Sequence, residues 1–245
     1  MSSATLASIA FIIISFSWIV YIVQEMFITG SSALNMVVSE NEAERKQIQV
    51  ISGIHFDGIE VWLLVSIVLT LGVFPMVFAE TFTYLYVIFF LLLYAIIARG
   101  VSIEVIYKMD SKKWIKAMVL TWTVSSALLI FILGVYISNI FYGFPLDSSG
   151  EMASSYFSLF NITGIFGGLF FLSAAMTAGA GWIKLNTTGD VGDKALKFVK
   201  KYGVIYVLPI SLMIVVMGFN NTDASIYIGE LFSKSIVFFL LPLAT

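Results

Sequence analysis

The sequence predicts an all-α membrane protein, a polytopic bundle of transmembrane helices. Hydrophobic residues make up 60% of the 245 positions, charged residues only 11%, and there are 22 phenylalanines. A soluble domain commonly carries about a quarter of its residues as charged side chains. A soluble core of this size could hardly enclose so many phenylalanine rings. We therefore expect an integral membrane protein.

Six apolar segments have the length of about 20 residues that a helix needs to cross the hydrocarbon core. They are residues 6–29, 59–78, 82–98, 114–142, 156–183 and 202–219. A further apolar stretch, residues 226–245, carries Glu230 and Lys234 and is either a short last span or an interfacial helix. The expectation is six spans plus a possible short seventh.

The basic residues predict the orientation of these spans. Twelve of the 13 lysines and arginines fall after the first, third and fifth segments, whereas the opposite loops carry only acidic charges. The basic residues are Arg45, Lys46, Arg99, Lys108, Lys112, Lys113, Lys116, Lys184, Lys194, Lys197, Lys200 and Lys201. The positive-inside rule makes the basic loops cytoplasmic and places the N-terminus outside. The start "MSSATLASIA" has no basic region, so we do not expect a cleaved signal peptide.

Several kinds of chemistry are excluded by composition. The chain has no cysteine, which excludes disulfides, thiolate metal sites and cysteine nucleophiles. A single histidine, His55, makes a zinc or di-iron site built on several histidines implausible. An axial haem ligand must lie inside the helix bundle, whereas His55 is expected in a cytoplasmic loop. No metal site is therefore predicted.

Four ionisable side chains are expected at the cytoplasmic ends of the first two spans. Glu25 lies about one turn before the predicted end of the first, and Asp57 and Glu60 share one face at the start of the second, with His55 just outside. Ionisable groups in or beside a span are costly and are functional candidates. Partial burial favours the neutral form of a carboxylate, so such groups could exchange protons near neutral pH. The pattern favours a proton path from the cytoplasm.

Simpler interpretations exist for some of these residues. Asp57 precedes a helix start and could act only as an N-cap, and acidic groups in a first turn also suit the helix dipole. Glu25 lies inside an apolar helix near its C-terminal end, where the dipole disfavours it. Arg99 closes the third span and either extends to the interface or pairs with a carboxylate.

Small residues are regularly spaced in the fifth segment. Gly164 and Gly168, and then Ala175 and Gly179, have the small-xxx-small spacing that lets helix backbones approach closely in lipid. We expect tight helix packing there.

Several motifs together resemble subunit II of the cytochrome bd-type quinol oxidases. They are "DGIEVWLL" (57–64), "FPMVFAETF" (74–82), "ARGVSIE" (98–104) and "GFPLD" (143–147), in the family's order, with "ENEAERK" (40–46) resembling its charged first loop. The resemblance covers roughly residues 22 to 185. The family's first helix usually ends in a motif with two aspartates, where this chain has Glu25 and Ile28. Phe56 and Ile59 replace a usual tryptophan and a frequent asparagine.

The resemblance also implies how the chain divides. The family usually has about eight spans, so residues 1–145 correspond to a first four-helix unit and residues 146–245 to a shortened second unit. It implies a subunit that binds no haem itself and packs against a haem-bearing subunit I, where haem b, haem d and the quinol site lie. A quinone or lipid could bind here as well, and the resemblance implies the cell membrane of a prokaryote as the location.

The resemblance implies a role in delivering protons for oxygen reduction. Glu25 and Asp57 would carry them, with His55 and Glu60 as entry groups and Arg99 as charge partner. One alternative is a purely structural scaffold subunit, favoured by Ile28 and the short second half. Another is an independent proton-coupled transporter, although the inverted repeats and mid-membrane helix breaks typical of transporters are missing from the sequence.

Overall fold

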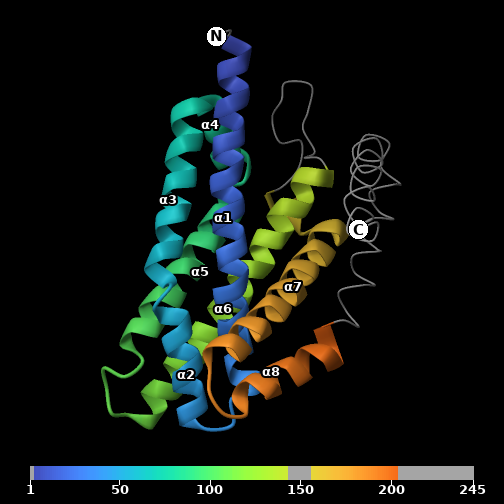
Figure 1. Cartoon of the computed structure of the whole chain (residues 1–245). Helices are drawn as coiled ribbons and strands as arrows, with labels where there is room; N and C mark the ends of the chain where they lie inside the picture. The colour runs from blue at the N-terminus through green and yellow to red at the C-terminus, as the bar shows by residue number, and fades with distance from the viewer. Residues whose placement is uncertain (1–2, 143–155, 204–245) are drawn as a thin grey trace, which may run out of the picture.

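The computed structural model describes residues 3–142 and 156–203, and these residues form helices packed into one bundle (Figure 1). The elements are α1 (Ser3–Val38), α2 (Glu42–Gly53), α3 (Phe56–Val73), α4 (Pro75–Tyr84), α5 (Tyr86–Val105), α6 (Lys112–Tyr142), a 3-10 turn η1 (Tyr156–Phe160), α7 (Ile162–Asn186), α8 (Val191–Phe198) and a π-helical turn η2 (Val199–Gly203). The described part contains no strand, which confirms the all-α prediction.

Five helical segments of the described part are long and apolar enough to cross a membrane. They are Thr5–Val38, Glu42–Val73, Tyr86–Val105, Lys112–Ile140 and Ile162–Asn186. α7 packs along both α1 and α6, α5 packs along α6, and α3 lies against α1. These segments correspond to the first five predicted spans. The predicted segments 202–219 and 226–245 lie outside the described residues, apart from the last two residues of η2.

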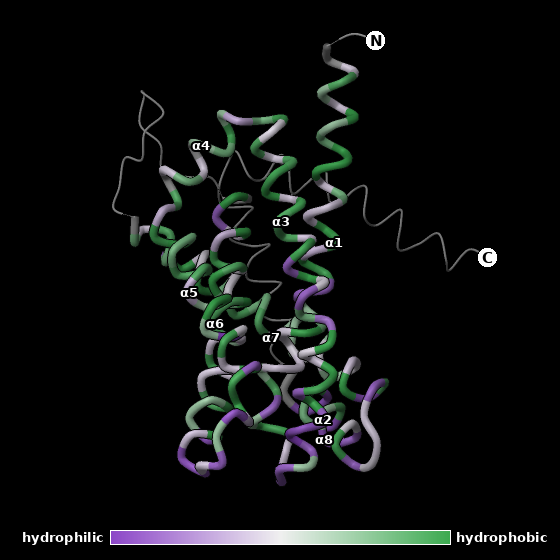
Figure 2. Tube along the Cα trace, turned by 90° about the vertical axis from the view of Figure 1, so that its left-hand side faces the viewer, coloured by the Kyte–Doolittle hydropathy of each residue, from purple (hydrophilic) through white to green (hydrophobic). Residues whose placement is uncertain are grey.

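The basic loops lie together at one end of the bundle. Figure 2 shows hydrophilic residues gathered where α2 and α8 lie, opposite the N-terminus. We call this the basic end, because Arg45, Lys46, Lys112 and Lys194 all belong to elements there. This common location is what the predicted orientation requires. The side of the membrane that it faces stays a prediction.

The first predicted segment is too short. α1 continues nine residues beyond Thr29 to Val38, so Glu25 lies 13 residues before the helix end instead of one turn. At about 1.5 Å per residue this is about 20 Å. The hydroxyl groups of Ser31 and Ser32 both donate to the carbonyl oxygen of Ile28, at 2.7 and 2.9 Å, so polar residues are accommodated inside the helix.

The second predicted segment is broken near its end by Pro75. α3 ends at Val73, Phe74 leaves the helical conformation with φ −125° and ψ 64°, and Pro75 begins α4. Proline suits a first helical position because it has no N–H to donate and its φ is fixed near the helical value. The single predicted span from 59 to 78 is therefore wrong at its C-terminal end.

The charged stretch after α1 is a helix, whereas the sequence was interpreted as a loop. Asn41 caps α2 by accepting a 2.9 Å hydrogen bond from the backbone N–H of Glu44. Ile48 is fully buried in a core at the basic end that also contains Leu34, Trp122 and Ile183. The amphipathic pattern of α2 thus stabilises it against α1 and α7.

Small residues determine how closely α7 packs, as predicted. A Cβ at Gly30 of α1 would overlap the backbone of Ala175, and one at Gly179 would overlap the backbone of Ser31. Gly168 meets α6 instead, where an added Cβ would lie 2.6 Å from Cε2 of Phe131. α7, which was assigned to a second unit, is therefore packed tightly on two helices of the first. The proposed boundary at 145/146 itself lies outside the described residues.

At the end of the bundle opposite the basic end, Asn139 joins α6 to the start of α7. Its buried Nδ2 donates to the carbonyl oxygens of Val135 and Leu159, at 2.7 and 2.8 Å, and its Oδ1 accepts from Asn161 Nδ2 at 2.9 Å. Asn161 in turn caps α7 by accepting from the N–H of Gly164 at 2.7 Å. The amides therefore satisfy several polar groups between these two helices.

Candidate functional site

A buried charge cluster formed by Glu25, Thr29, Glu60 and Arg99 lies between α1, α3 and α5. Arg99 is only 1% exposed. Its Nη1 donates to Glu25 Oε1 and to Thr29 Oγ1, and its Nη2 donates to Glu60 Oε1 at 2.9 Å. The guanidinium therefore joins carboxylates from two other helices, one of them 74 positions away in sequence.

Local sequence explains why these groups meet. Glu25 and Thr29 are one helical turn apart on α1, so both face the same way, and the Thr29 hydroxyl donates to Glu25 Oε1. The ring of Phe56 lies 5.0 Å from the Arg99 guanidinium carbon, a cation–π arrangement. Gly100 makes room for that ring, because a Cβ there would lie 2.9 Å from Phe56 Cζ.

The two oxygens of Glu25 differ in their surroundings. Oε1 accepts from both Thr29 and Arg99, whereas Oε2 is buried and has no hydrogen-bond partner among the described residues. Glu25 is fully buried, while the side chain of Glu60 is 22% exposed. The cluster thus contains two carboxylates and one guanidinium, with one carboxylate reaching the edge of the bundle.

Asp57 and His55 lie outside the cluster. Asp57 is exposed in the first turn of α3. It is not the N-cap that the simpler interpretation required, because α3 begins at Phe56 and His55 occupies that position without a side-chain cap. His55 is exposed, with Nδ1 3.3 Å from the carbonyl oxygen of Ile51 and its ring edge-on to Trp182 at 5.2 Å between centroids.

The structure therefore separates the predicted site residues into two groups. Glu25, Glu60 and Arg99 come together, whereas His55 and Asp57 are exposed around the start of α3. Of the two alternatives for Arg99, extension to the interface is wrong, since the side chain is buried and paired. Sequence reasoning missed Thr29, although its spacing of four from Glu25 in an apolar helix was a usable signal.

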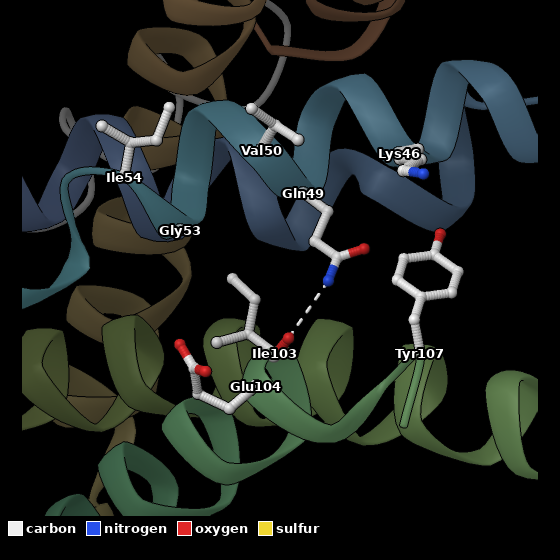
Figure 3. A pocket seen from close by; sticks show the side chains of 8 residues that line it. All are labelled: Lys46, Gln49, Val50, Gly53, Ile54, Ile103, Glu104 and Tyr107. Carbon is white, nitrogen blue, oxygen red and sulfur yellow. Dashed lines mark hydrogen bonds between the residues drawn. The ribbon is translucent and has the colours of Figure 1, made fainter. Parts of the chain in front are cut away.

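A separate surface pocket lies between α2 and the end of α5 (Figure 3). It has a volume of about 280 Å³ and is lined by Lys46, Gln49, Val50, Gly53, Ile54, Ile103, Glu104 and Tyr107. Gln49 Nε2 spans it to the carbonyl oxygen of Ile103 at 3.1 Å, as the dashed line in Figure 3 shows. Within the described ranges, no three His, Cys, Asp or Glu side chains are placed to hold a metal ion.

Long apolar helices around a buried ion-paired cluster define a polytopic helical membrane protein with ionisable groups inside its bundle. The family model described as cytochrome bd terminal oxidase subunit II matches residues 6–245, and the chain belongs to that family. The resemblance that the motifs carry is thereby confirmed.

Three relatives illustrate the extent of the match. Cytochrome bd ubiquinol oxidase subunit 2 of Bacillus subtilis (strain 168) is 30% identical over 207 residues, which are 83% of this chain and 61% of that protein. Probable cytochrome oxidase subunit 2 of Haemophilus influenzae is 29% identical, over 76% of this chain and 50% of that protein. Cytochrome bd-I ubiquinol oxidase subunit 2 of Escherichia coli (strain K12) is 24% identical, over 70% and 46%. The chain thus matches only about half to three fifths of the length of these relatives.

Proposed function

We propose that this chain is subunit II of a bd-type quinol:oxygen oxidoreductase, in which its buried charge cluster takes part in proton uptake from the cytoplasm. Membership of the family supports the complex, because the Bacillus subtilis relative is named as a subunit of a cytochrome bd ubiquinol oxidase. In this proposal the chain packs against a haem-bearing subunit I, and the basic end faces the cytoplasm.

Burial supports a direction for the proton path. His55 and Asp57 are exposed, the side chain of Glu60 is 22% exposed, and Glu25 is fully buried. The observation that carries the proposal is Glu25 Oε2, a buried carboxylate oxygen without a partner among the described residues. It has free lone pairs for a proton, and accepting one would leave both bonds to Oε1 in place. Glu60 would pass protons inward from the exposed groups.

Haem b and haem d belong to subunit I in this proposal. An axial ligand must reach into the bundle, and His55, the chain's one histidine, is exposed at the start of α3. The described bundle therefore offers no histidine inside it for axial ligation, and the role proposed for this chain involves only proton transfer and packing. The pocket beside Val50 and Ile54 has an apolar wall that suits a lipid chain or a quinone tail.

The first test is Glu25→Gln in the complex purified from its own membranes. Proton transfer by a positioned group commonly contributes about 100-fold or more to a rate, so we expect quinol oxidation to slow by at least about tenfold. Haem content and copurification of the partner should be unchanged. Glu42→Gln, which removes an exposed carboxylate in the first turn of α2, is the matched control and should keep full turnover. Normal turnover in Glu25→Gln would remove Glu25 from the mechanism.

A structural scaffold is the alternative, and the ion pairs of Arg99 favour it. Arg99 connects α1, α3 and α5, and breaking a buried ion pair by removing one partner is commonly costly, about 3–5 kcal/mol. A scaffold would lose assembly and haem together in Glu25→Gln, with turnover per remaining haem unchanged. A chain that purifies alone, without a haem-bearing partner, would contradict both functions.

A further inference from the structure

We propose that Glu60 holds an exchangeable proton in the resting protein, while Thr29 and Arg99 keep Glu25 ionised. The proposal deepens the proposed role in proton uptake and rests on it for its functional meaning. The proton itself is measurable without turnover. It also assigns a positioning role to Thr29, which is not among the residues implied by the family resemblance.

The charges of the cluster require such a proton. One guanidinium faces two carboxylates, and the ion pairs that Glu25 and Glu60 form within the described part of the chain are both with Arg99. With both carboxylates ionised, the cluster would carry one net negative charge between apolar helices. An uncompensated buried charge is costly, and a proton on one carboxylate removes it.

The hydrogen bonds decide which carboxylate takes the proton. Glu25 Oε1 accepts from the Thr29 hydroxyl and from Arg99 Nη1, and hydrogen bonds to the charged form favour that form. Glu60 accepts one bond from Arg99, at 2.9 Å. Asp57 is a like charge one turn earlier on the same face of α3, and it further disfavours the ionised form of Glu60. Tyr21 of α1 is neutral near pH 7 and adds no charge to the cluster.

The arrangement also explains how the proton moves. Glu60 is 22% exposed and lies one turn after the exposed Asp57 at the start of α3, so its proton would exchange with the aqueous side by way of that end of the helix. A proton transferred from Glu60 to Glu25 Oε2 would leave Glu60 ionised and Glu25 neutral, so the total charge of the cluster would not change. Thr29 holds Oε1 of Glu25 in the network during this transfer, which leaves Oε2 as the accepting atom.

The proton on Glu60 can be tested by infrared spectroscopy of the purified complex, as the difference between spectra in H₂O and in D₂O. A protonated carboxyl has a carbonyl band that the ionised form lacks. Near neutral pH we expect one such band from the cluster, shifted on transfer to D₂O. Glu60→Gln should remove it, Glu60→Asp should move it, and the control Glu42→Gln should leave it unchanged. In Thr29→Val, Glu25 loses a hydrogen-bond donor to its ionised form, so part of the proton population should move from Glu60 to Glu25. The carbonyl band should then divide between two frequencies. Thr29→Ser, which keeps the hydroxyl, should match the wild type.

Each result bears on the proposal. A band that survives unchanged in Glu60→Gln, or no band in the wild type, overturns it. If Glu60→Gln does not assemble, an unmoved band in Glu60→Asp overturns the assignment to Glu60. An unaltered band in Thr29→Val overturns the role of Thr29. The outcome is separable from the proposed function, since a band on Glu60 together with normal turnover in Glu25→Gln would support the proton while removing the uptake role.

Discussion

The crossing of α1 and α7 gives a sharp prediction, because two helix backbones meet there without a side chain between them. In Gly30→Ala the new Cβ would overlap the carbonyl group of Ala175, at a distance far below 3.0 Å, the closest approach that real Cβ atoms show. The colliding atoms belong to the backbone of α7 and cannot rotate away. The helices must therefore separate, and the core around Leu34 and Ile183 loosens with them.

The magnitude follows from two opposing effects. Overpacking commonly costs about 1–3 kcal/mol, and a clash with backbone belongs at the upper limit. Alanine is a better helix former than glycine by about 1 kcal/mol, which offsets part of the loss. We expect a net destabilisation of about 2 kcal/mol, which is roughly a 30-fold change in the unfolding equilibrium.

A graded series makes the measurement decisive. Gly134→Ala is expected to cost less than Gly30→Ala, because its Cβ would lie 2.7 Å from the carbonyl oxygen of Gly167 and 2.8 Å from Cα of Gly168. Gly181→Ala on α7 is the control, since nothing lies within 4 Å of its Cβ. The midpoint of thermal unfolding is measured in mild detergent by tryptophan fluorescence. It should be highest for Gly181→Ala, lower for Gly134→Ala and lowest for Gly30→Ala. Equal midpoints for Gly30→Ala and Gly181→Ala would refute the close crossing.

Three further predictions concern other parts of the bundle. Asn139→Ala leaves a carbonyl oxygen and an amide without their partner and should lower stability by about 1–3 kcal/mol, seen as a lower unfolding midpoint. Gly100→Ala should displace the ring that lies over the buried guanidinium, a contact worth about 2 kcal/mol when desolvated, and alanine regains about 1 kcal/mol as a better helix former. The net cost should be about 1 kcal/mol, seen as a slightly lower unfolding midpoint. Lys194 donates hydrogen bonds to the carboxylates of Glu40 and Glu44, and these bonds raise the pKa of Lys194. Their stabilisation of α8 is fully present below the lysine's ordinary pKa and is lost as pH rises through the raised value. The unfolding midpoint in mild detergent should therefore be lower in Lys194→Met than in the wild type at neutral pH, and this difference should disappear at strongly alkaline pH.

Apolar run length predicted the existence of the described spans but not where they end. α1 continues through residues 30–38, where Ser31, Ser32 and Asn35 are buried. Hydropathy treats these residues as a loop signal, because it scores each side chain as if it faced solvent or lipid alone. In the structure the hydroxyl groups of Ser31 and Ser32 bond to the carbonyl oxygen of Ile28, and that of Ser31 also lies 3.0 Å from the hydroxyl of Ser52 on α2. Small polar residues are tolerated where helices approach closely. The end of α1 is therefore determined by packing between helices and not by local sequence.

The same reason limited the prediction of the charged segment after α1. Its sequence has the cap residue Asn41 and a single strongly buried apolar position, Ile48, among charged neighbours. A short helix of this kind is marginal in isolation and is stabilised by packing of its apolar face. The partners of that face are α1 and α7, which no local pattern in residues 42–53 identifies.

The candidate site shows the same division between local and long-range information. Glu25, Glu60 and Arg99 stood out because each is an ionisable residue in an apolar run, which is a property of one position. Their mutual pairing depends on contacts between residues 39 and 74 positions apart, and no spacing rule within one helix contains it. Thr29 lies between these cases, since its bond to Glu25 is local but its bond to Arg99 is not. The Thr29 hydroxyl accepts a hydrogen bond from the guanidinium of Arg99 on α5 as well as donating to Glu25. Thr29→Val therefore tests a contact between helices that the sequence alone did not specify.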